Sequence, residues 1–77
     1  MDDKDEFKAR LAYWVQYYRT KQGLSQMELA VRVSIDTRQI GRIEQQVNVP
    51  SVILAYHIAK VLKVKVDALL QPIPDHL

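Results

Sequence analysis

The chain has 77 residues and a mass of 9.0 kDa, which is enough for one small domain, and its apolar content of 48% allows it to bury a core. It has no cysteine and only two glycines, which excludes disulfides, thiolate metal sites, thiol nucleophiles and a glycine-rich phosphate loop. No apolar run approaches the ~20 residues of a membrane span, and the acidic start does not fit a signal peptide. We therefore expect a single cytoplasmic domain over residues 1–77 that works by binding, with no catalytic site, metal or cofactor.

Charge is distributed unevenly along the chain. Four of the nine acidic residues lie within residues 1–6, an acidic start that precedes the main body. The remaining residues carry ten Lys or Arg against five acids, a net charge of +5. This balance favours an anionic partner.

The predicted elements are all helices, and the first covers residues 4–22. Its apolar side chains recur at the spacing of one helical face. These are Phe7, Leu11, Trp14, Val15 and Tyr18. We expect Asp3 to cap this helix, with Glu6 completing a capping box, and Gly23 to end it in a left-handed conformation.

Two short helices follow. Ser25 and Glu28 have the spacing of a capping box, which starts a second helix that buries Leu29, Ala30 and Val33. Ser34 and Ile35 form a turn, and Asp36 caps a third helix. The third helix is expected to bury Ile40, Ile43 and part of Glu44, and to present Arg38, Gly41, Arg42 and Gln45 on its opposite face.

A loop over residues 45–50 separates these helices from the C-terminal part. Ser51 is predicted to cap a fourth helix of about eleven residues. Its inward side chains are Val52, Ala55, Ile58, Ala59 and Leu62. A last turn is expected at residues 66–70, and prolines at positions 72 and 74 make residues 71–77 a tail.

A long helix, a short helix, a four-residue turn and another helix follow one another as in a helix-turn-helix. The segments GLSQMELA, IDTRQIGRIE, VPS and HIAKVLKVKVDALL resemble the DNA-binding domain of the lambda-repressor/Cro (Xre-type) family, over about residues 11–70. The resemblance implies an all-α domain of five helices, whose third helix enters the major groove of DNA.

The resemblance also implies roles for individual residues. Thr37, Arg38 and Arg42 match positions that read base edges, and an arginine can bond guanine O6 and N7 together. Gln26, at the start of the second helix, matches a glutamine that binds phosphate and braces the recognition helix. Gln45 and Asn48 are the other candidates for backbone contact. Gly41 is either a neutral weak point of the helix or a bare patch that lets the helix lie close to the groove.

Arg19 and Glu44 look like catalytic residues but match a structural ion pair of the family, which ties the first helix to the end of the third. His57 is expected to be solvated on the outer face of the fourth helix, and His76 in the tail has no assigned role.

The chain departs from the family pattern at two points. Gln46 stands where relatives often have glycine followed by basic residues, and here the loop reads QQVNVPS. Lys63 also replaces a common glycine at the end of the fourth helix. We expect few phosphate contacts for each protomer.

Several apolar residues exceed the needs of the predicted core, which indicates an interface. Ile53, Leu54, Val61 and Val66 are the candidates for a twofold dimer through the last two helices, and Tyr56 and Ile73 also remain. Alternatively, several of these side chains pack beneath the tail. Tyr13 and Tyr17 are weaker candidates for a second interface or a phosphate contact.

The expected function is that of a transcriptional regulator, a homodimeric repressor that binds double-stranded DNA at an inverted repeat. The alternative is a protein-interaction module, such as an antitoxin or antirepressor, that holds a second protein on the apolar surface of the fourth helix. An enzyme has no residue constellation to support it.

Overall fold

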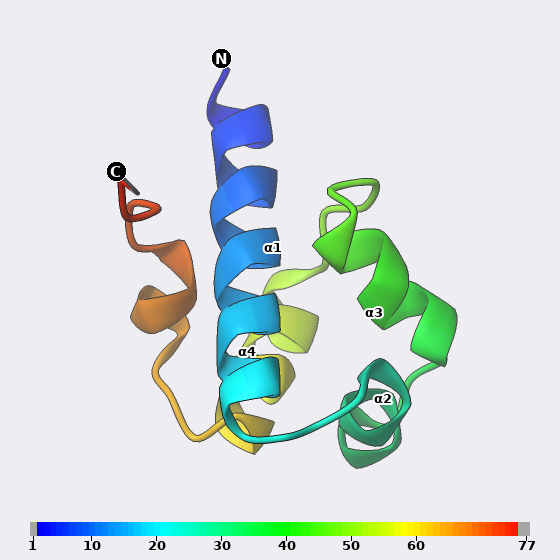
Figure 1. Ribbon diagram of the computed structural model, residues 1–77. Helices are drawn as coiled ribbons and strands as arrows, with labels where there is room; N and C mark the ends of the chain where they lie inside the picture. Colours follow the sequence, from blue (N-terminus) through cyan, green and yellow to red (C-terminus); the bar gives the residue numbers. More distant parts are fainter. Residues whose placement is uncertain (1, 76–77) are drawn as a thin grey trace.

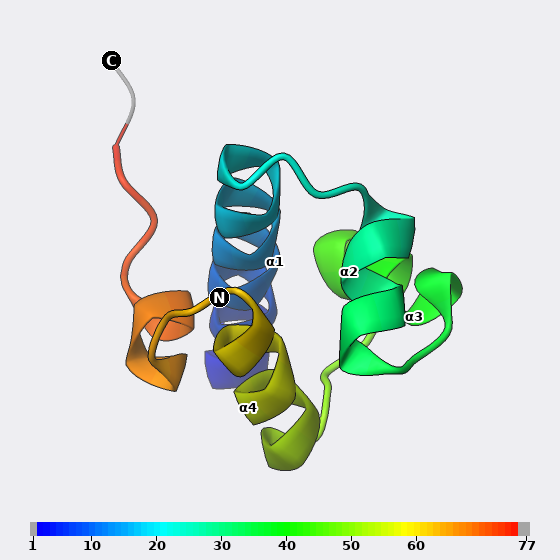
Figure 2. The ribbon, with the colours of Figure 1, turned by 90° about the horizontal axis from the view of Figure 1, so that it is seen from below.

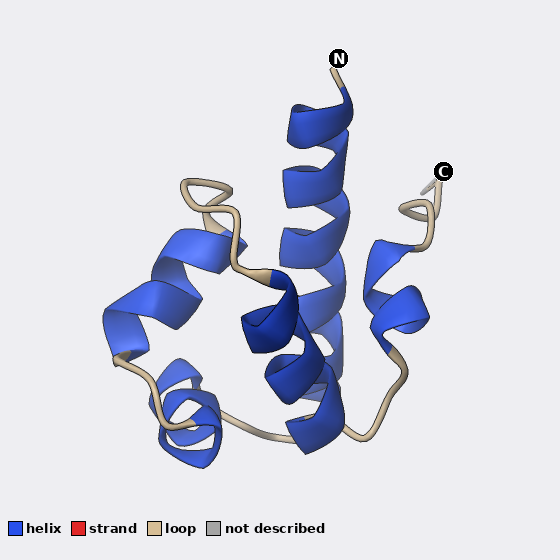
Figure 3. Cartoon of the chain, turned by 180° about the vertical axis from the view of Figure 1, so that it is seen from behind, coloured by secondary structure: helices blue, strands red, loops and turns tan. Residues whose placement is uncertain are grey.

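The computed structural model describes residues 2–75, which form four α-helices and one 3-10 helix, with no strand among them (Figures 1 and 3). In chain order they are α1 (Asp3–Lys21), α2 (Gln26–Val33), α3 (Thr37–Glu44), α4 (Val52–Val61) and η1 (Val66–Leu70). The all-α fold class is confirmed, and the fifth helix is a single 3-10 turn. His76 lies outside the described residues.

The caps of α1 match the prediction at one end only. Asp2, not Asp3, is the N-cap residue, and its carboxylate accepts a hydrogen bond from the Asp5 N–H at 2.8 Å. The predicted cap was therefore wrong by one residue, because several acids in a row allow more than one frame. The C-terminal end is as predicted, since Gly23 adopts φ +73° and the Leu24 N–H bonds the Arg19 carbonyl.

The three following helices start at the predicted residues. Ser25 and Glu28 form both hydrogen bonds of the capping box. The Asp36 carboxylate accepts from the Arg38 N–H, and the Ser51 hydroxyl accepts from the Leu54 N–H. Each cap satisfies a helical N–H that has no intrahelical partner.

The core draws a buried side chain from every helix. Its largest fully buried side chains are Leu11, Val15, Leu29, Ile40, Ile58, Leu62 and Leu69. Val52 was predicted to point inward, but it is 86% exposed. It occupies the first position of α4, where the chain arrives from the surface loop, and the buried face begins with Ala55.

Helix α1 is the central element, with η1 on one side and α2 and α3 on the other (Figure 2). Two side chains of α1 hold the last residue of η1 and the residue that follows it. The Arg10 guanidinium donates to the Leu70 carbonyl at 3.0 Å, and Trp14 Nε1 donates to the Gln71 carbonyl at 2.8 Å. The start of the tail is thus fixed to α1. No helix within residues 2–75 is both long and apolar enough to cross a lipid bilayer.

Candidate nucleic-acid interface

The turn between α2 and α3 sets the angle of the two helices. Ser34 adopts a left-handed conformation with φ 68°, and the Ile35 N–H bonds the Ala30 carbonyl at 3.0 Å. Ile35 is half-buried and packs against the core. The turn places α3 across α2 at the edge of the molecule (Figure 1). One long face of α3 is left open to solvent.

The open face of α3 carries most of the residues predicted to contact DNA. Ile40 and Ile43 face the core, as predicted. A shallow hollow on the opposite side is lined by Gln26, Thr37, Arg38, Gly41, Arg42 and Gln45. Asn48 is not part of this hollow. It lies in the loop after α3, where it lines a separate groove with Gln39 and Pro50.

Gln26 reaches from α2 to α3. Its Nε2 donates to Glu44 Oε1 at 3.0 Å, so the side chain ties the start of α2 to the end of α3. Its Oε1 lies 3.7 Å from the place where a Cβ on Gly41 would sit, which is an ordinary van der Waals contact. Position 41 therefore has room for a methyl group within the protein itself.

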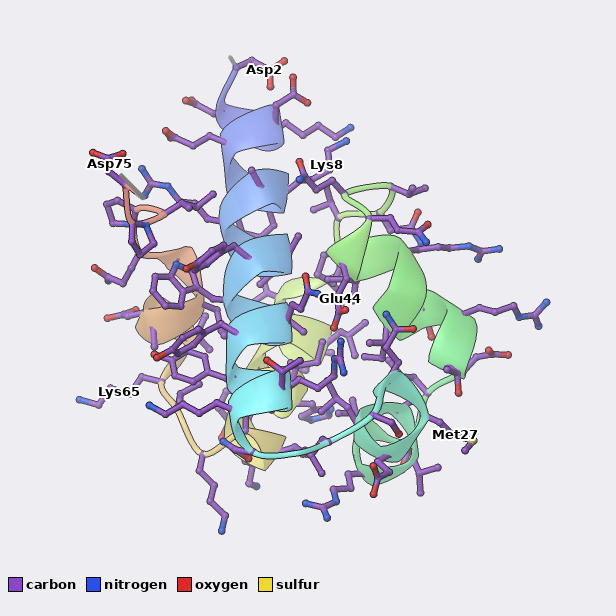
Figure 4. All side chains as sticks on the ribbon, in the orientation of Figure 1. Asp2, Lys8, Met27, Glu44, Lys65 and Asp75 are labelled. Atoms are coloured by element: carbon purple, nitrogen blue, oxygen red, sulfur yellow. The ribbon has the colours of Figure 1, made fainter. Side chains whose placement is uncertain are left out.

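The position of α3 relative to α1 is fixed by an ion pair of low exposure. Arg19 Nε and Nη2 donate to the two carboxylate oxygens of Glu44, at 2.7 and 3.0 Å. Arg19 Nη1 also donates to the Leu24 carbonyl at 2.9 Å. Figure 4 shows Glu44 lying between α1 and α3. Within residues 2–75, every buried side-chain nitrogen and oxygen has a hydrogen-bond partner.

One feature of the interface was missed by sequence reasoning, which assigned Asp36 only as a cap. The Arg38 guanidinium turns back to Asp36, with Nε 3.3 Å from Oδ1 and Nη2 3.1 Å from Oδ2. The hydrogen bonds from the Arg38 side chain and backbone lower the pKa of the Asp36 carboxyl. The signal was available in the sequence, because an N-cap aspartate lies two residues before an arginine.

The residues predicted for the dimer interface differ in exposure. Ile53 is 67% exposed, whereas Leu54, Val61 and Val66 are partly buried against the core of their own protomer. These three are thus not surplus to the core. The exposed apolar residues of this region are Val47, Val49, Val52, Ile53 and Tyr56. They occupy the loop after α3 and the first turns of α4.

The aromatic residues of α1 form a second group, in which Tyr17 is exposed and Tyr13 and Trp14 are half-buried. Tyr13 and Tyr17 stack with ring centroids 6.3 Å apart, and Trp14 meets both rings edge-on. The Lys21 ammonium lies 5.5 Å from the centre of the Tyr17 ring. His57 is exposed on α4, as predicted, and its ring contacts Tyr56.

The fold is shared with solved structures. A hypothetical transcription factor, NHTF from Neisseria, superposes with a TM-score of 0.85 at 28% identity, over 94% of this chain and 83% of that one. The restriction-modification controller protein C.AhdI from Aeromonas hydrophila has a TM-score of 0.77 at 24% identity, over 80% and 94% of the two chains. A transcriptional regulator of the HTH_3 family from Vibrio cholerae has a TM-score of 0.81 at 24% identity, and 86% of this chain covers 37% of that protein.

No curated protein sequence matches the chain. The helix-turn-helix family model HTH_3 matches residues 15–69, which include all of α2, α3 and α4. The match covers well over half of the 77 residues. The protein therefore belongs to the HTH_3 family of lambda-repressor-like (Xre-type) helix-turn-helix proteins, and it is a DNA-binding transcriptional regulator and not an enzyme.

Proposed function

We propose that the protein is a homodimeric repressor that recognises an inverted-repeat operator in the cytoplasm. The observation that carries this proposal is the hollow on α3, where Thr37, Arg38 and Arg42 converge with Gln26 from the start of α2. Two arginines on one exposed helical face suit the acceptor atoms of guanine in the major groove. Thr37 adds a hydroxyl that can bond a base edge.

Backbone contacts come from the ends of the two helices. Gln26 occupies the first turn of α2, where helical N–H groups lack intrahelical partners and attract an anion. Gln45 and Asn48 follow the end of α3 and extend the interface along the phosphate strand. Val47 and Val49, between and after them, offer no charge to phosphate. We therefore propose a modest number of phosphate contacts for each protomer.

Dimerisation supplies the specificity that a single α3 lacks. One recognition helix reads only a few base pairs, and two copies at fixed spacing read two half-sites. Ile53 is the most exposed of the residues proposed for the seam, with Leu54, Val61 and Val66 at its margins. Val52 and Tyr56 extend this apolar surface.

Selection of bound duplexes from a random pool tests the proposal. We expect the selected sites to contain an inverted repeat with guanines in each half, bound by two protomers. The logarithm of affinity should fall with the logarithm of salt concentration at a slope of about −3 to −6 for a dimer. Folded protein that selects no sequence and binds no duplex at low salt contradicts the proposal.

The variants Arg38→Ala and Arg42→Ala separate base reading from positioning. Each should lose about 1–3 kcal/mol on the selected site and relax the choice of base at one position of each half. Gln26→Ala should weaken all duplexes similarly, since a phosphate contact carries no sequence information. If the alanine variant of one arginine lowers affinity for every duplex equally, that arginine contacts phosphate and not a base.

A second candidate function is that of a protein-interaction module, such as an antitoxin or antirepressor. The exposed Val47 and Val49 favour it, because they stand where phosphate-binding residues are expected. In that case the folded protein binds no duplex with sequence preference, and it binds a second protein through this loop and α4.

A further inference from the structure

Asp36 and Arg38 form a closed pair at the start of α3. Asp36 Oδ1 accepts from both the backbone N–H and Nε of Arg38, at 2.8 and 3.3 Å. Its Oδ2 accepts from Nη2 at 3.1 Å. Both carboxylate oxygens of Asp36 thus bond Arg38. These bonds hold the Arg38 side chain at the N-terminal end of α3, where it lines the hollow.

The pair uses only one edge of the guanidinium group. An arginine has five N–H donors in a rigid plane, and Asp36 occupies the edge formed by Nε and Nη2. The end of the group, formed by Nη1 and the second hydrogen of Nη2, has no other partner within residues 2–75. Two parallel N–H bonds from this end match guanine O6 and N7. Arg38 can therefore hold Asp36 and a guanine at the same time.

Water weakens this pair in the free protein, because both side chains are largely exposed. When α3 lies in a groove, water is excluded and the same hydrogen bonds become stronger. The negative charge of Asp36 has a second effect there, because it repels phosphate oxygens that come close to the start of α3. The positive charge of Arg42 also attracts the Asp36 carboxylate and lowers its pKa, more weakly than Arg38 does.

We propose that Asp36 is a specificity-determining residue, which positions Arg38 for end-on recognition of guanine and lowers affinity for DNA that lacks this guanine. The inference rests on the proposed function, since it requires α3 to read the major groove. Asp36 itself acts through Arg38 and is a positioning residue. The cap of α3 and the orientation of the reading arginine thus come from one carboxylate.

The test compares Asp36→Asn, Arg38→Ala and the double variant on the selected duplex. Asparagine is a good N-cap residue, so Asp36→Asn should keep the helix while it removes the charge and one of the two acceptors. The probe duplexes carry guanine, 7-deazaguanine or adenine at the base read by Arg38. The unmodified protein should prefer guanine over both alternatives, because 7-deazaguanine lacks the N7 acceptor.

Asp36→Asn should reduce the preference for guanine about tenfold. It should also raise affinity for unrelated duplexes at low salt by roughly two- to fivefold, because one negative charge is removed from the interface. In the Arg38→Ala background, Asp36→Asn should leave base preference unchanged. Glu28→Gln is the matched control, since it removes one negative charge from the start of α2, where the carboxylate bonds the Ser25 N–H instead.

The outcomes separate this inference from the function on which it rests. If Asp36→Asn and the unmodified protein prefer guanine equally, Asp36 is only a cap, and DNA recognition by α3 stands without the inference. If Asp36→Asn loses helical content, Asp36→Ser replaces it as a second capping variant without the carboxylate. If the folded, unmodified protein binds no duplex, both the proposed function and this inference are wrong.

Discussion

Arg19 in the last turn of α1 and Glu44 at the end of α3 form a two-point hydrogen bond, with side chains only 11% and 6% exposed. Gln26 adds a third bond to Glu44 from the start of α2. Helices α1 and α2 therefore both hold α3 through one carboxylate. A change at this carboxylate should affect both folding and the position of the recognition helix.

Loss of one partner of this pair should be strongly destabilising. Arg19→Ala leaves the Glu44 charge in a site of low exposure, and we expect the free energy of unfolding to fall by about 3 kcal/mol, measured by denaturant titration. Glu6→Gln is the control, since the Glu6–Arg10 pair on α1 is much more exposed than the Arg19–Glu44 pair and contributes at most about 0.5 kcal/mol. Equal effects of the two substitutions would show that the Arg19–Glu44 pair does not stabilise the fold.

Gly41→Ala distinguishes a weak point in α3 from a surface that must stay bare. The new methyl group meets only Gln26 Oε1, at 3.7 Å, so we expect stability to rise by about 1 kcal/mol. If α3 lies close to the groove at this position, affinity for the selected duplex should fall while stability rises. Thermal unfolding and duplex titration of the same variant measure the two effects. Unchanged affinity would make Gly41 a neutral position.

The two positions where this chain departs from the family's glycines both adopt left-handed backbone. Gln46 has φ 64° and Lys63 has φ 62°, and each follows the end of a helix. Because this conformation is unfavourable for residues with a Cβ, we expect Lys63→Gly to stabilise the protein by about 1 kcal/mol. This corresponds to a rise in Tm of roughly 4–8 °C for a domain of this size.

Lys65→Gly is the matched control for this substitution. It removes the same charge from an exposed residue, but Lys65 has extended backbone with φ −77°. Glycine there should lower stability by roughly 0.5–1 kcal/mol, because the unfolded chain gains freedom. If both variants shift Tm in the same direction, backbone conformation at Lys63 is not the cause.

Features of the fold that depend on residues close in sequence were predictable, whereas features that depend on contacts between helices were not. The capping box at Ser25 and the left-handed Gly23 are local patterns, and the structure has both as expected. The exposed Val52 and the partly buried Leu54 depend on how α4 meets the loop and α3, which no local pattern encodes. The Asp36–Arg38 contact is local, but it depends on the rotamer of the Arg38 side chain. The two-residue spacing in the sequence therefore permits this contact and does not require it.

Acid should destabilise the helix start at Glu28. Hydrogen bonds from Ser25, first from its backbone N–H and then from its hydroxyl, lower the pKa of the Glu28 carboxyl. Because the folded-state pKa is lowered, this stabilisation is complete above the unfolded-state pKa and is lost as the pH falls through the lower folded-state value. Glu28→Gln should be less stable than the unmodified protein at neutral pH, and the difference should close as the pH falls through the lowered folded-state pKa of Glu28. Denaturant titrations across this range measure it, and a difference independent of pH would contradict the assignment.

Ile53 offers the cleanest test of the dimer. It is 67% exposed on α4, so Ile53→Glu should leave the protomer folded, whereas glutamate at the partly buried Leu54 or Val61 would also disturb the core. A glutamate at an apolar seam buries an unpaired charge twice in a twofold interface, and we expect sedimentation to show monomers. The variant should keep weak binding to a half-site and lose cooperative binding to the inverted repeat. Val31→Glu is the control, since Val31 is 70% exposed on α2 and should not change association. If the unmodified protein is a monomer at tens of micromolar and binds DNA as one protomer per duplex, the apolar surface of α4 serves another protein.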